Sequence, residues 1–423
     1  MWKLKIPQKA IELHKNYFMY AVVKSIKNAE VDKNNEYEVK VHDFLNQIIS
    51  AQDTNNSNEK ITCEDIAVGD YEKLRLFDSK IYSIIKDLNK ENGCSENNEY
   101  SSFLNSVLKW FGYEEFSSLS NVNNVSRSIY HYIEDLYGDG RYDAQGNYYG
   151  WKHPADMKKW LQNWLNSKGI ELKNYTKKYF EEWLVEVVFN DITIENYKGS
   201  LLEKIGMWTP TVLNILLNIK VCPYCNRQYI TPIIINGKQL RGDLDHFIPK
   251  SRHPWLSMSL YNLVPCCHIC NSRLKSNTEI TFSDLAPYRD NVASQFKYVY
   301  DEIEGTIEAK AIDNTNLKIK KYLSLYKINE TLKYHTDIPR KIFLRLQAYP
   351  YGYVQGLINQ RIISEADRKS IYNDIIGCPL DEKDIDQEIL GKLKKDMERQ
   401  FRKLLDAEAD SYHDEIDARA DLK

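Results

Sequence analysis

Eight cysteines occur in this chain of 423 residues, and five of them lie between positions 222 and 270. Cys222 and Cys225 form one C-x-x-C pair, and Cys267 and Cys270 form a second, with 41 residues between the pairs. Two thiolates at this spacing can bind one ion, and two such pairs complete the tetrahedral four-sulfur set that is typical of structural zinc. The clustering also argues against a disulfide framework. We therefore predict that these four cysteines bind a structural zinc ion.

Two neighbouring residues leave alternatives to this ligand set. Cys266 could replace Cys267, although only Cys267 has the C-x-x-C spacing to Cys270. His268 lies inside the second pair and could serve as a substitute ligand. Because four thiolates would close the coordination sphere, the predicted role of the zinc is to hold structure rather than to catalyse.

An acid and a histidine, Asp245 and His246, stand side by side between the two cysteine pairs, in L-D-H-F-I-P-K. In a strand their side chains would point to opposite faces, so that one could bind a metal ion while the other meets a water molecule. Hydrolysis of a phosphodiester needs a general base and a cation that stabilises charge on the phosphate. We assign the first role to His246 and the second to Asp245, which would bind a hard ion such as Mg²⁺. Asn271, directly after Cys270, could offer a carbonyl oxygen as the second ligand.

A structural interpretation of the Asp-His pair stays open at this point. Most such dipeptides form a capped turn with a surface histidine. The chain would then be a non-catalytic zinc module that binds nucleic acid or a protein partner. The order of the motifs favours chemistry, since a C-x-x-C pair, Asp-His, an asparagine and a second C-x-x-C followed by Asn share one segment.

Positive charge is concentrated in the same stretch, although the whole chain has a net charge of −3. Between Lys220 and Lys275 there are eight Lys and Arg against two acids, a local +6 that leaves −9 for the rest. A local patch, and not the average, decides whether a phosphate backbone is attracted. We expect Lys250, Arg252, Arg273 and Lys275 to hold such a backbone. Chance clustering on a solvated loop is the alternative.

Helical patterns on both sides must position these motifs. Apolar residues recur at helical spacing through residues 1–200, interrupted by short polar loops. Residues 207–220 are apolar on most sides and predict a buried helix that leads into the first cysteine pair. Residues 296–311 alternate apolar and polar types across a Glu-Gly turn, which predicts a β-hairpin. From 385 to 404 the apolar residues follow steps of three and four, which predicts an amphipathic helix.

The expected fold is α+β and mostly helical. At ~100–200 residues per domain the length allows two to three domains. We predict a helical N-terminal region at 1–200 for recognition or partner binding, a central zinc-containing module at 201–290, and a hairpin with helices at 291–423. No segment approaches the ~18 consecutive apolar residues of a membrane span, and the start lacks an apolar signal-peptide core. We therefore expect a cytoplasmic protein without a membrane partner.

The stretch Cys222–Lys275, with C-P-Y-C, L-D-H-F-I-P-K and N-L-V-P-C-C-H-I-C-N-S-R-L-K, resembles the HNH, or ββα-metal, endonuclease family in its zinc-knuckle form. The resemblance implies a β-hairpin and a following helix that cradle one catalytic ion, with the four-cysteine zinc site holding the ends together. It implies that Asp245 binds the catalytic metal, that His246 is the general base and that Asn262 ties down the loop between strands and helix. Asn271 would complete the metal site in place of the family's final His, which leaves Mg²⁺ or Mn²⁺ open.

Hydrolysis of DNA is the activity that this resemblance implies, and hydrolysis of RNA is the narrower alternative. The flanks resemble the HNH proteins of bacterial anti-phage systems such as Septu and certain retrons, which work with an ABC-type ATPase. The predicted hairpin, the segment L-S-L-Y-K-I-N-E-T-L-K-Y-H at 323–335 and the helix at 391–401 carry this likeness. It implies a role in antiviral defence and an ABC-type ATPase as partner.

Overall fold

The computed structural model describes residues 3–50, 61–92, 98–119, 208–235, 238–276, 278–349, 351–364, 366–379 and 382–420, together with a few positions between 162 and 171. The chain divides into two compact units. The histidine unit, named for His246, comprises Ile6–Asn218 and Thr231–Val264. The cysteine unit, named for the four predicted zinc ligands, comprises Met1–Lys5, Ile219–Ile230 and Pro265–Lys423.

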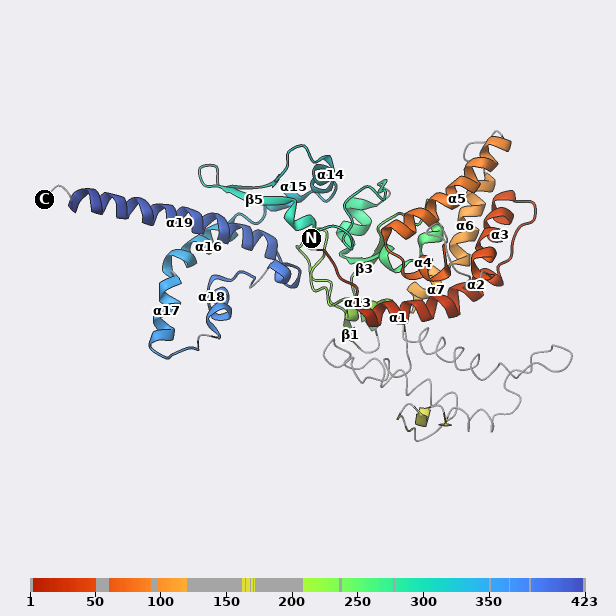
Figure 1. Cartoon of the computed structure of the whole chain (residues 1–423), viewed down its shortest axis with the longest axis horizontal. Coiled ribbons are helices and arrows are strands. Elements are labelled where there is room, and N and C mark those ends of the chain that lie inside the picture. Colours follow the sequence, from red (N-terminus) through yellow and green to blue (C-terminus); the bar gives the residue numbers. More distant parts are fainter. Residues whose placement is uncertain are drawn as a thin grey trace. The chain divides into compact units, whose positions relative to one another are not determined.

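Helices make up most of the described histidine unit (Figure 1). They are α1 (Gln8–Tyr17), the π-helical run η1 (Phe18–Val22), α2 (Val23–Lys27), α3 (Glu36–Ser50), α4 (Cys63–Val68), α5 (Tyr71–Asn92), α6 (Asn98–Trp110), α7 (Tyr113–Ser118) and α13 (Pro210–Leu217). Apolar side chains at helical spacing, among them Phe18, Phe77 and Phe103, lie in the core with almost no exposed surface. Burial of these rings is the main stabilising term for such a unit.

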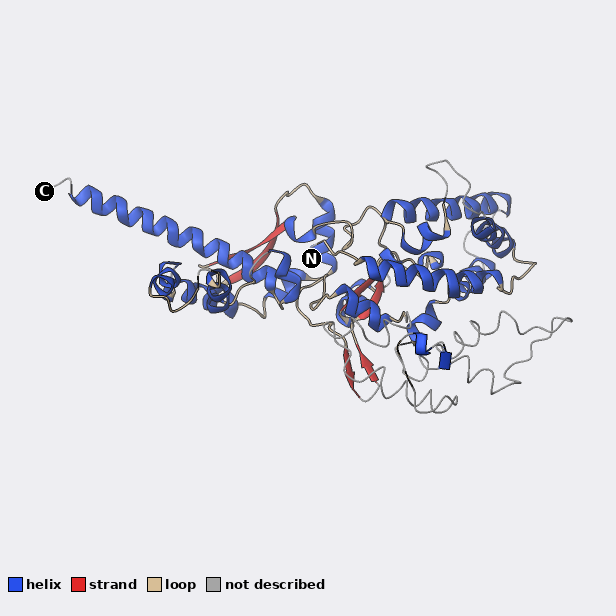
Figure 2. Cartoon of the chain, turned by 60° about the horizontal axis from the view of Figure 1, so that its bottom comes forward, coloured by secondary structure: helices blue, strands red, loops and turns tan. Residues whose placement is uncertain are grey.

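Four short strands form two pairs, and Figure 2 draws strands as red arrows. Strands β1 (Ile233–Ile235) and β2 (Lys238–Leu240) are antiparallel, and β3 (Asp243–His246) pairs with β4 (Leu263–Cys266). The 3₁₀ turns η2 (Pro254–Leu256) and η3 (Leu260–Asn262) lie between β3 and β4.

Helix α5 holds the loop between β3 and β4 through one buried carboxylate. Asp78 accepts hydrogen bonds at its Oδ1 from the ring nitrogen Nδ1 of His253, at 2.6 Å, and from Nε1 of Trp255, at 2.8 Å. The ring of Tyr82, one turn farther along α5, packs edge-on against both rings. A buried carboxylate without such donors would be strongly destabilising, so these contacts fix the loop to the helix.

The cysteine unit combines one hairpin with a series of helices. Its elements are the π-helical turn η4 (Ile269–Lys275), the 3₁₀ turn η5 (Val292–Ser294), β5 (Phe296–Asp301), β6 (Thr306–Ala311), α14 (Leu317–Leu325), α15 (Ile328–Leu332), α16 (Asp337–Ala348), α17 (Tyr351–Asn359), α18 (Arg368–Ile376), the 3₁₀ turn η6 (Glu382–Gln387) and α19 (Gly391–Ala420). The hairpin predicted at 296–311 is confirmed, with Phe296 opposite Ala311 and Asp301 opposite Thr306.

Side chains of α19 cover the outer edge of β5. The carboxylate of Asp396 accepts the backbone N–H of Tyr298 at 2.8 Å. The amide of Gln400 accepts the N–H of Tyr300 at 3.0 Å and donates to its carbonyl at 2.8 Å. An open strand edge exposes unpaired backbone groups, and α19 pairs them here.

The predicted fold class is confirmed at the level of a mixed, mostly helical chain with small sheets. The helix expected at 385–404 begins later, at Gly391, because Leu390 adopts a left-handed φ of 56° that separates η6 from α19. The helix expected at 207–220 is α13, which begins at Pro210 and ends at Leu217, before Asn218 with its left-handed φ of 50°. Residues 120–161 and 172–200 of the predicted N-terminal region lie outside the described residues, and the three-part domain division stays a prediction. No described helix is both long and apolar enough to cross a bilayer.

Candidate functional site

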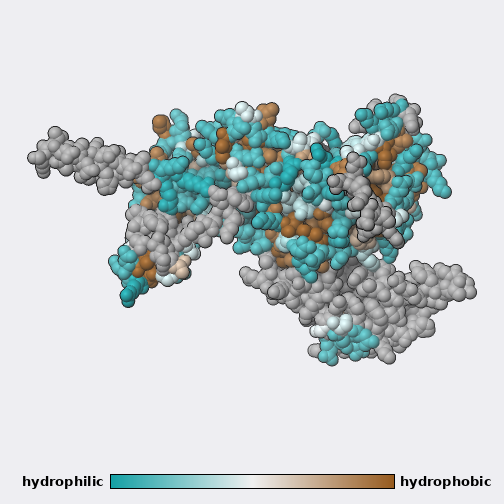
Figure 3. All heavy atoms as spheres, viewed as in Figure 1, coloured by the Kyte–Doolittle hydropathy of each residue, from teal (hydrophilic) through white to brown (hydrophobic). Residues whose placement is uncertain are grey.

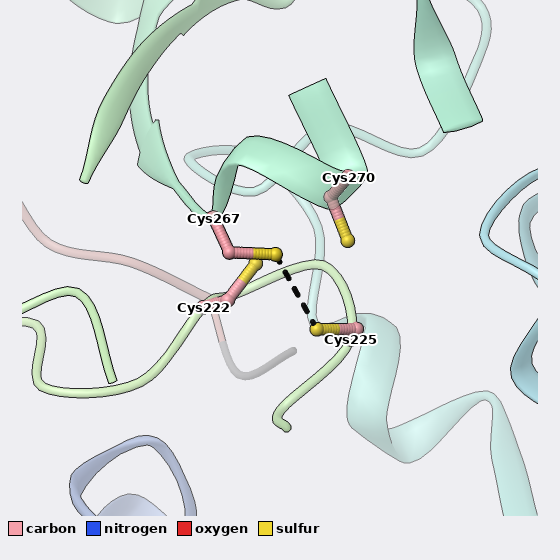
Figure 4. Close-up of side chains that lie close together, drawn as sticks. All are labelled: Cys222, Cys225, Cys267 and Cys270. Atoms are coloured by element: carbon pink, nitrogen blue, oxygen red, sulfur yellow. Dashed lines mark hydrogen bonds between the residues drawn. The ribbon is translucent and has the colours of Figure 1, made fainter. Parts of the chain in front are cut away.

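Four cysteine sulfurs of the cysteine unit point toward one common centre (Figure 4). The Sγ atoms of Cys222, Cys225, Cys267 and Cys270 all lie within 4.8 Å of one another, and those of Cys225 and Cys267 are 3.9 Å apart. In a tetrahedral zinc site with Zn–S bonds of ~2.3 Å, the sulfurs are ~3.8 Å apart. The observed spacing therefore fits a metal ion such as zinc.

Burial of the four side chains suits a closed site. Their exposed fractions are 5% or less. Burial raises the pKa of Cys222, whereas hydrogen bonds from the neighbouring thiols, that of Cys222 first, lower the pKa of Cys267. Four thiolates could not share this buried space without a compensating cation, since each would repel the others. The two alternatives are not part of the group, because Cys266 is buried elsewhere and His268 is exposed with its Nδ1 3.3 Å from the Ser272 hydroxyl.

The first cysteine pair is shaped by its own backbone. The N–H of Asn226 donates to the carbonyl of Cys222 at 2.8 Å, and the N–H of Cys222 donates to the carbonyl of Gln228 at 2.9 Å. Asn226 has a φ of 54°, a left-handed conformation that asparagine tolerates better than most residues. These bonds bring both sulfurs of the pair to the same side of a tight turn.

Side chains from distant parts of the cysteine unit clamp this turn in place. The amide of Asn226 donates to the carbonyl of Ile385 at 2.9 Å and accepts the N–H of Lys392 at 3.0 Å. The hydroxyl of Tyr322, on α14, donates to the carbonyl of Tyr224 at 2.6 Å. The thiol group is therefore tied directly to α14 and to the start of α19.

The Asp-His pair lies in the histidine unit, on the buried strand β3. Asp245 and His246 are 3% and 7% exposed. The Nε2 atom of His246 lies 3.0 Å from the carbonyl oxygen of Ser257. A carbonyl can only accept, so Nε2 carries the hydrogen and the neutral ring has its lone pair on Nδ1. The ring is thus fixed in the tautomer that makes Nδ1 the basic atom.

One aromatic ring packs against this histidine, and a lysine lies over that ring. The ring of Tyr113, at the start of α7, meets the His246 ring edge-on with centroids 4.3 Å apart. The Nζ atom of Lys250 lies 4.4 Å from the centroid of the same Tyr113 ring. Burial raises the pKa of Tyr113 and lowers the pKa of Lys250. The N-terminal helices therefore contribute directly to the surroundings of His246.

The side chain of Asn262 joins backbone groups of the loop that follows β3. Its Oδ1 accepts the N–H of Ile248 at 2.7 Å, and its Nδ2 donates to the carbonyls of Ile248 and Leu256, both at 3.1 Å. The side chain is fully buried, so each of these bonds satisfies a group that has no access to water. The contacts are those that a loop-tying asparagine would make.

A second histidine supports the loop segment that orients His246. His14, on α1, donates from Nε2 to the carbonyl of Met258 at 2.8 Å and accepts at Nδ1 from Nε1 of Trp208 at 3.0 Å. Met258 follows Ser257, so two consecutive carbonyls each hold one histidine ring. Burial lowers the pKa of His14 to about 4, which keeps this ring neutral.

The predicted basic residues do not share one environment. Lys250 is half-buried, and the side chains of Arg252 and Arg273 are exposed. Lys275 is only 2% exposed, which argues against the phosphate contact expected of it. It belongs with Arg273 to η4, and the sequence could not reveal which side of that π-helical turn faces inward.

The units divide the predicted catalytic residues. Asp245, His246 and Asn262 belong to the histidine unit, whereas Asn271 belongs to the cysteine unit. A shared metal ion on Asp245 and Asn271 therefore stays a prediction. Sequence reasoning missed Tyr113, His14 and the carbonyl of Ser257, because no motif marks them.

Comparison of the chain with protein-family models, with curated proteins and with solved structures gave no match. The case for a function therefore rests on the residues and their geometry.

Proposed function

We propose that this chain is a metal-dependent endonuclease of the HNH kind that hydrolyses DNA. The observation that supports it most is the setting of His246. The ring lies on a strand beside a carboxylate, and its Nε2 hydrogen is held by the carbonyl of Ser257. The lone pair of Nδ1 then has a defined direction, which is what a general base needs.

In the proposed reaction His246 takes a proton from a water molecule at Nδ1. The water oxygen attacks phosphorus in line and becomes part of the 5′-phosphate. The P–O bond to the 3′-oxygen breaks, and that oxygen takes up a proton from solvent and leaves as a 3′-hydroxyl. Tyr113 packs against the ring and limits its rotation. Asn262 keeps the loop that carries the Ser257 carbonyl in place through its bond to Leu256.

Asp245 would hold a divalent ion such as Mg²⁺ or Mn²⁺, which prefers oxygen ligands. When bound, the ion supplies positive charge against the phosphate and the leaving oxygen. Asp245 suits this role because it is a buried carboxylate next to the base. Lys250 and Arg252 would contact the backbone of the nucleic acid from the histidine unit, largely without sequence readout.

A cleavage panel with wild-type and His246→Ala protein tests the proposal. Plasmid, single-stranded DNA and RNA are each incubated with Mg²⁺ or Mn²⁺. We expect wild type to cleave DNA and His246→Ala to be slower by about 10²–10⁴-fold, the usual contribution of general base catalysis. The matched control is His268→Ala, which removes an exposed histidine outside the thiol group and should cleave as wild type does.

Several outcomes would contradict this assignment. If folded, metal-loaded His246→Ala protein cleaves as fast as wild type, His246 is not the base. If neither protein cleaves but both bind nucleic acid or a protein partner, the chain is the non-catalytic zinc module. If RNA is the faster substrate, the enzyme is an HNH ribonuclease.

A role in bacterial anti-phage defence with an ABC-type ATPase partner forms part of the proposal, and it is supported only by the resemblance of the flanks. Purification of the tagged chain from its own host tests it. Co-purification of an ATPase of this type supports the partnership, and a genomic neighbourhood without any ATPase or defence gene argues against it.

A further inference from the structure

A cavity of about 480 Å³ lies between β5 and α19 in the cysteine unit, and its lining includes none of the residues of the proposed reaction. Its volume is in the range of sites that bind small molecules. The apolar side chains Phe296, Val299 and Ile312 form part of its lining. The described surface over β5 and the start of α19 is mostly hydrophilic (Figure 3).

Cations outnumber acids around this cavity. Lys297, Lys392, Arg399 and Lys403 line it together with one carboxylate, Asp396. That carboxylate is already engaged, because its oxygens lie 2.6 and 2.7 Å from Nζ of Lys392. It also accepts a backbone N–H of β5. Lys297, Arg399 and Lys403 are exposed at the rim, where Arg399 also places its positive charge near Asp396.

Two residues of this rim, Lys403 and Lys297, each have a like charge as a neighbour. Arg399 and Lys403 are four residues apart on α19, a spacing at which two cations repel each other. Lys297 lies directly opposite Lys310 in the hairpin register, and like charges at that position are also destabilising. Glu308 offsets Lys310 at 3.2 Å, but neither Lys297 nor Lys403 forms an ion pair with a described residue. A bound anion would relieve both repulsions.

We propose that this groove binds a phosphate ester of nucleotide size. The phosphate would lie against Lys297, Arg399 and Lys403, and the organic part against the apolar lining. An inorganic anion would use the charges but not the apolar surface, which favours an ester. A free nucleotide and one unit of a nucleic-acid strand share this chemistry.

Binding measurements on the full chain distinguish a free nucleotide from a nucleic-acid strand as the ligand. The probes are a fluorescein-labelled single-stranded oligonucleotide and a fluorescent ATP analogue, titrated without added divalent metal so that no cleavage occurs. The test variant is Lys297→Ala/Arg399→Ala/Lys403→Ala. Its matched control, Lys318→Ala/Lys333→Ala/Arg340→Ala, removes three exposed charges from the same unit outside the cavity.

We expect the test variant to lose about tenfold in affinity for at least one probe, and the control less than about twofold. For the oligonucleotide, the slope of log affinity against log salt should fall by about 2, the value for three phosphate contacts to a single strand. Selective loss of oligonucleotide binding identifies a strand, and selective loss of the ATP analogue identifies a free nucleotide. Equal losses in both variants, or no loss for either probe, would overturn the proposal. These binding measurements test the proposal even if the chain does not cleave DNA.

Discussion

The two units hold their functional groups by different forces. In the cysteine unit four buried thiols surround a space that fits an ion, so metal–ligand bonds would fix their positions. In the histidine unit His246 is fixed by a carbonyl, an aromatic ring and a loop that hydrogen bonds hold in place. The cysteine unit should therefore respond to loss of metal, and the histidine unit to loss of buried hydrogen bonds.

Loss of the zinc ion predicted at the four thiols should have the largest effect on the difference between the two units. Cys222→Ser/Cys270→Ser takes one ligand from each pair, and we expect bound zinc to fall from about one per chain to near zero. Zinc binding to such sites is worth about 10–16 kcal/mol, which rivals the whole stability of a domain. The hairpin β5–β6 should then lose protection from hydrogen exchange, while the core amides of α5 keep theirs.

The neighbouring thiol provides the control for that experiment. Cys266→Ser changes a buried cysteine outside the group and should keep its zinc. Equal loss of protection in α5 and in the hairpin would show that the histidine unit also depends on the ion, and the contrast between the units would fail.

Acid should weaken the histidine unit through His14. Burial holds the pKa of His14 at about 4, against ~6.5 for an ordinary histidine. Between these values the unfolded chain binds a proton that the folded chain does not, so stability falls as the pH is lowered from about 6.5 to about 4. At about 1.4 kcal/mol per pH unit, the total is about 3 kcal/mol.

A variant that cannot titrate isolates this contribution. His14→Gln keeps an N–H for the carbonyl of Met258 and has no proton to gain in this range. We expect the unfolding free energy from urea titrations to fall less steeply with acid in His14→Gln than in wild type. Carboxylates are common to both proteins and cancel, so identical slopes would rule out His14 as the source.

The contrast between the units also explains which residues the sequence could reveal. The thiol group follows from two short spacings, because each pair shapes its own turn, and the β5–β6 hairpin follows from local alternation. The support for His246 is not local. His14 bonds to a carbonyl 244 residues away, and His253 meets Asp78 175 residues away, pairings that only packing determines. The sequence did not predict the burial of Lys275 either, because it also depends on packing.

The smallest expected effect concerns the clamp on the first cysteine pair. Burial raises the pKa of Tyr322 well above its ordinary value, so its hydroxyl stays protonated and donates to the carbonyl of Tyr224. Tyr322→Phe removes that donor and should cost about 1 kcal/mol of unfolding free energy, with zinc retained. Tyr334→Phe, at a tyrosine that is 82% exposed, should cost nothing measurable. If Tyr322→Phe instead released the zinc, hydrogen bonds and not metal–ligand bonds would hold the thiol group, and the two units would depend on the same force.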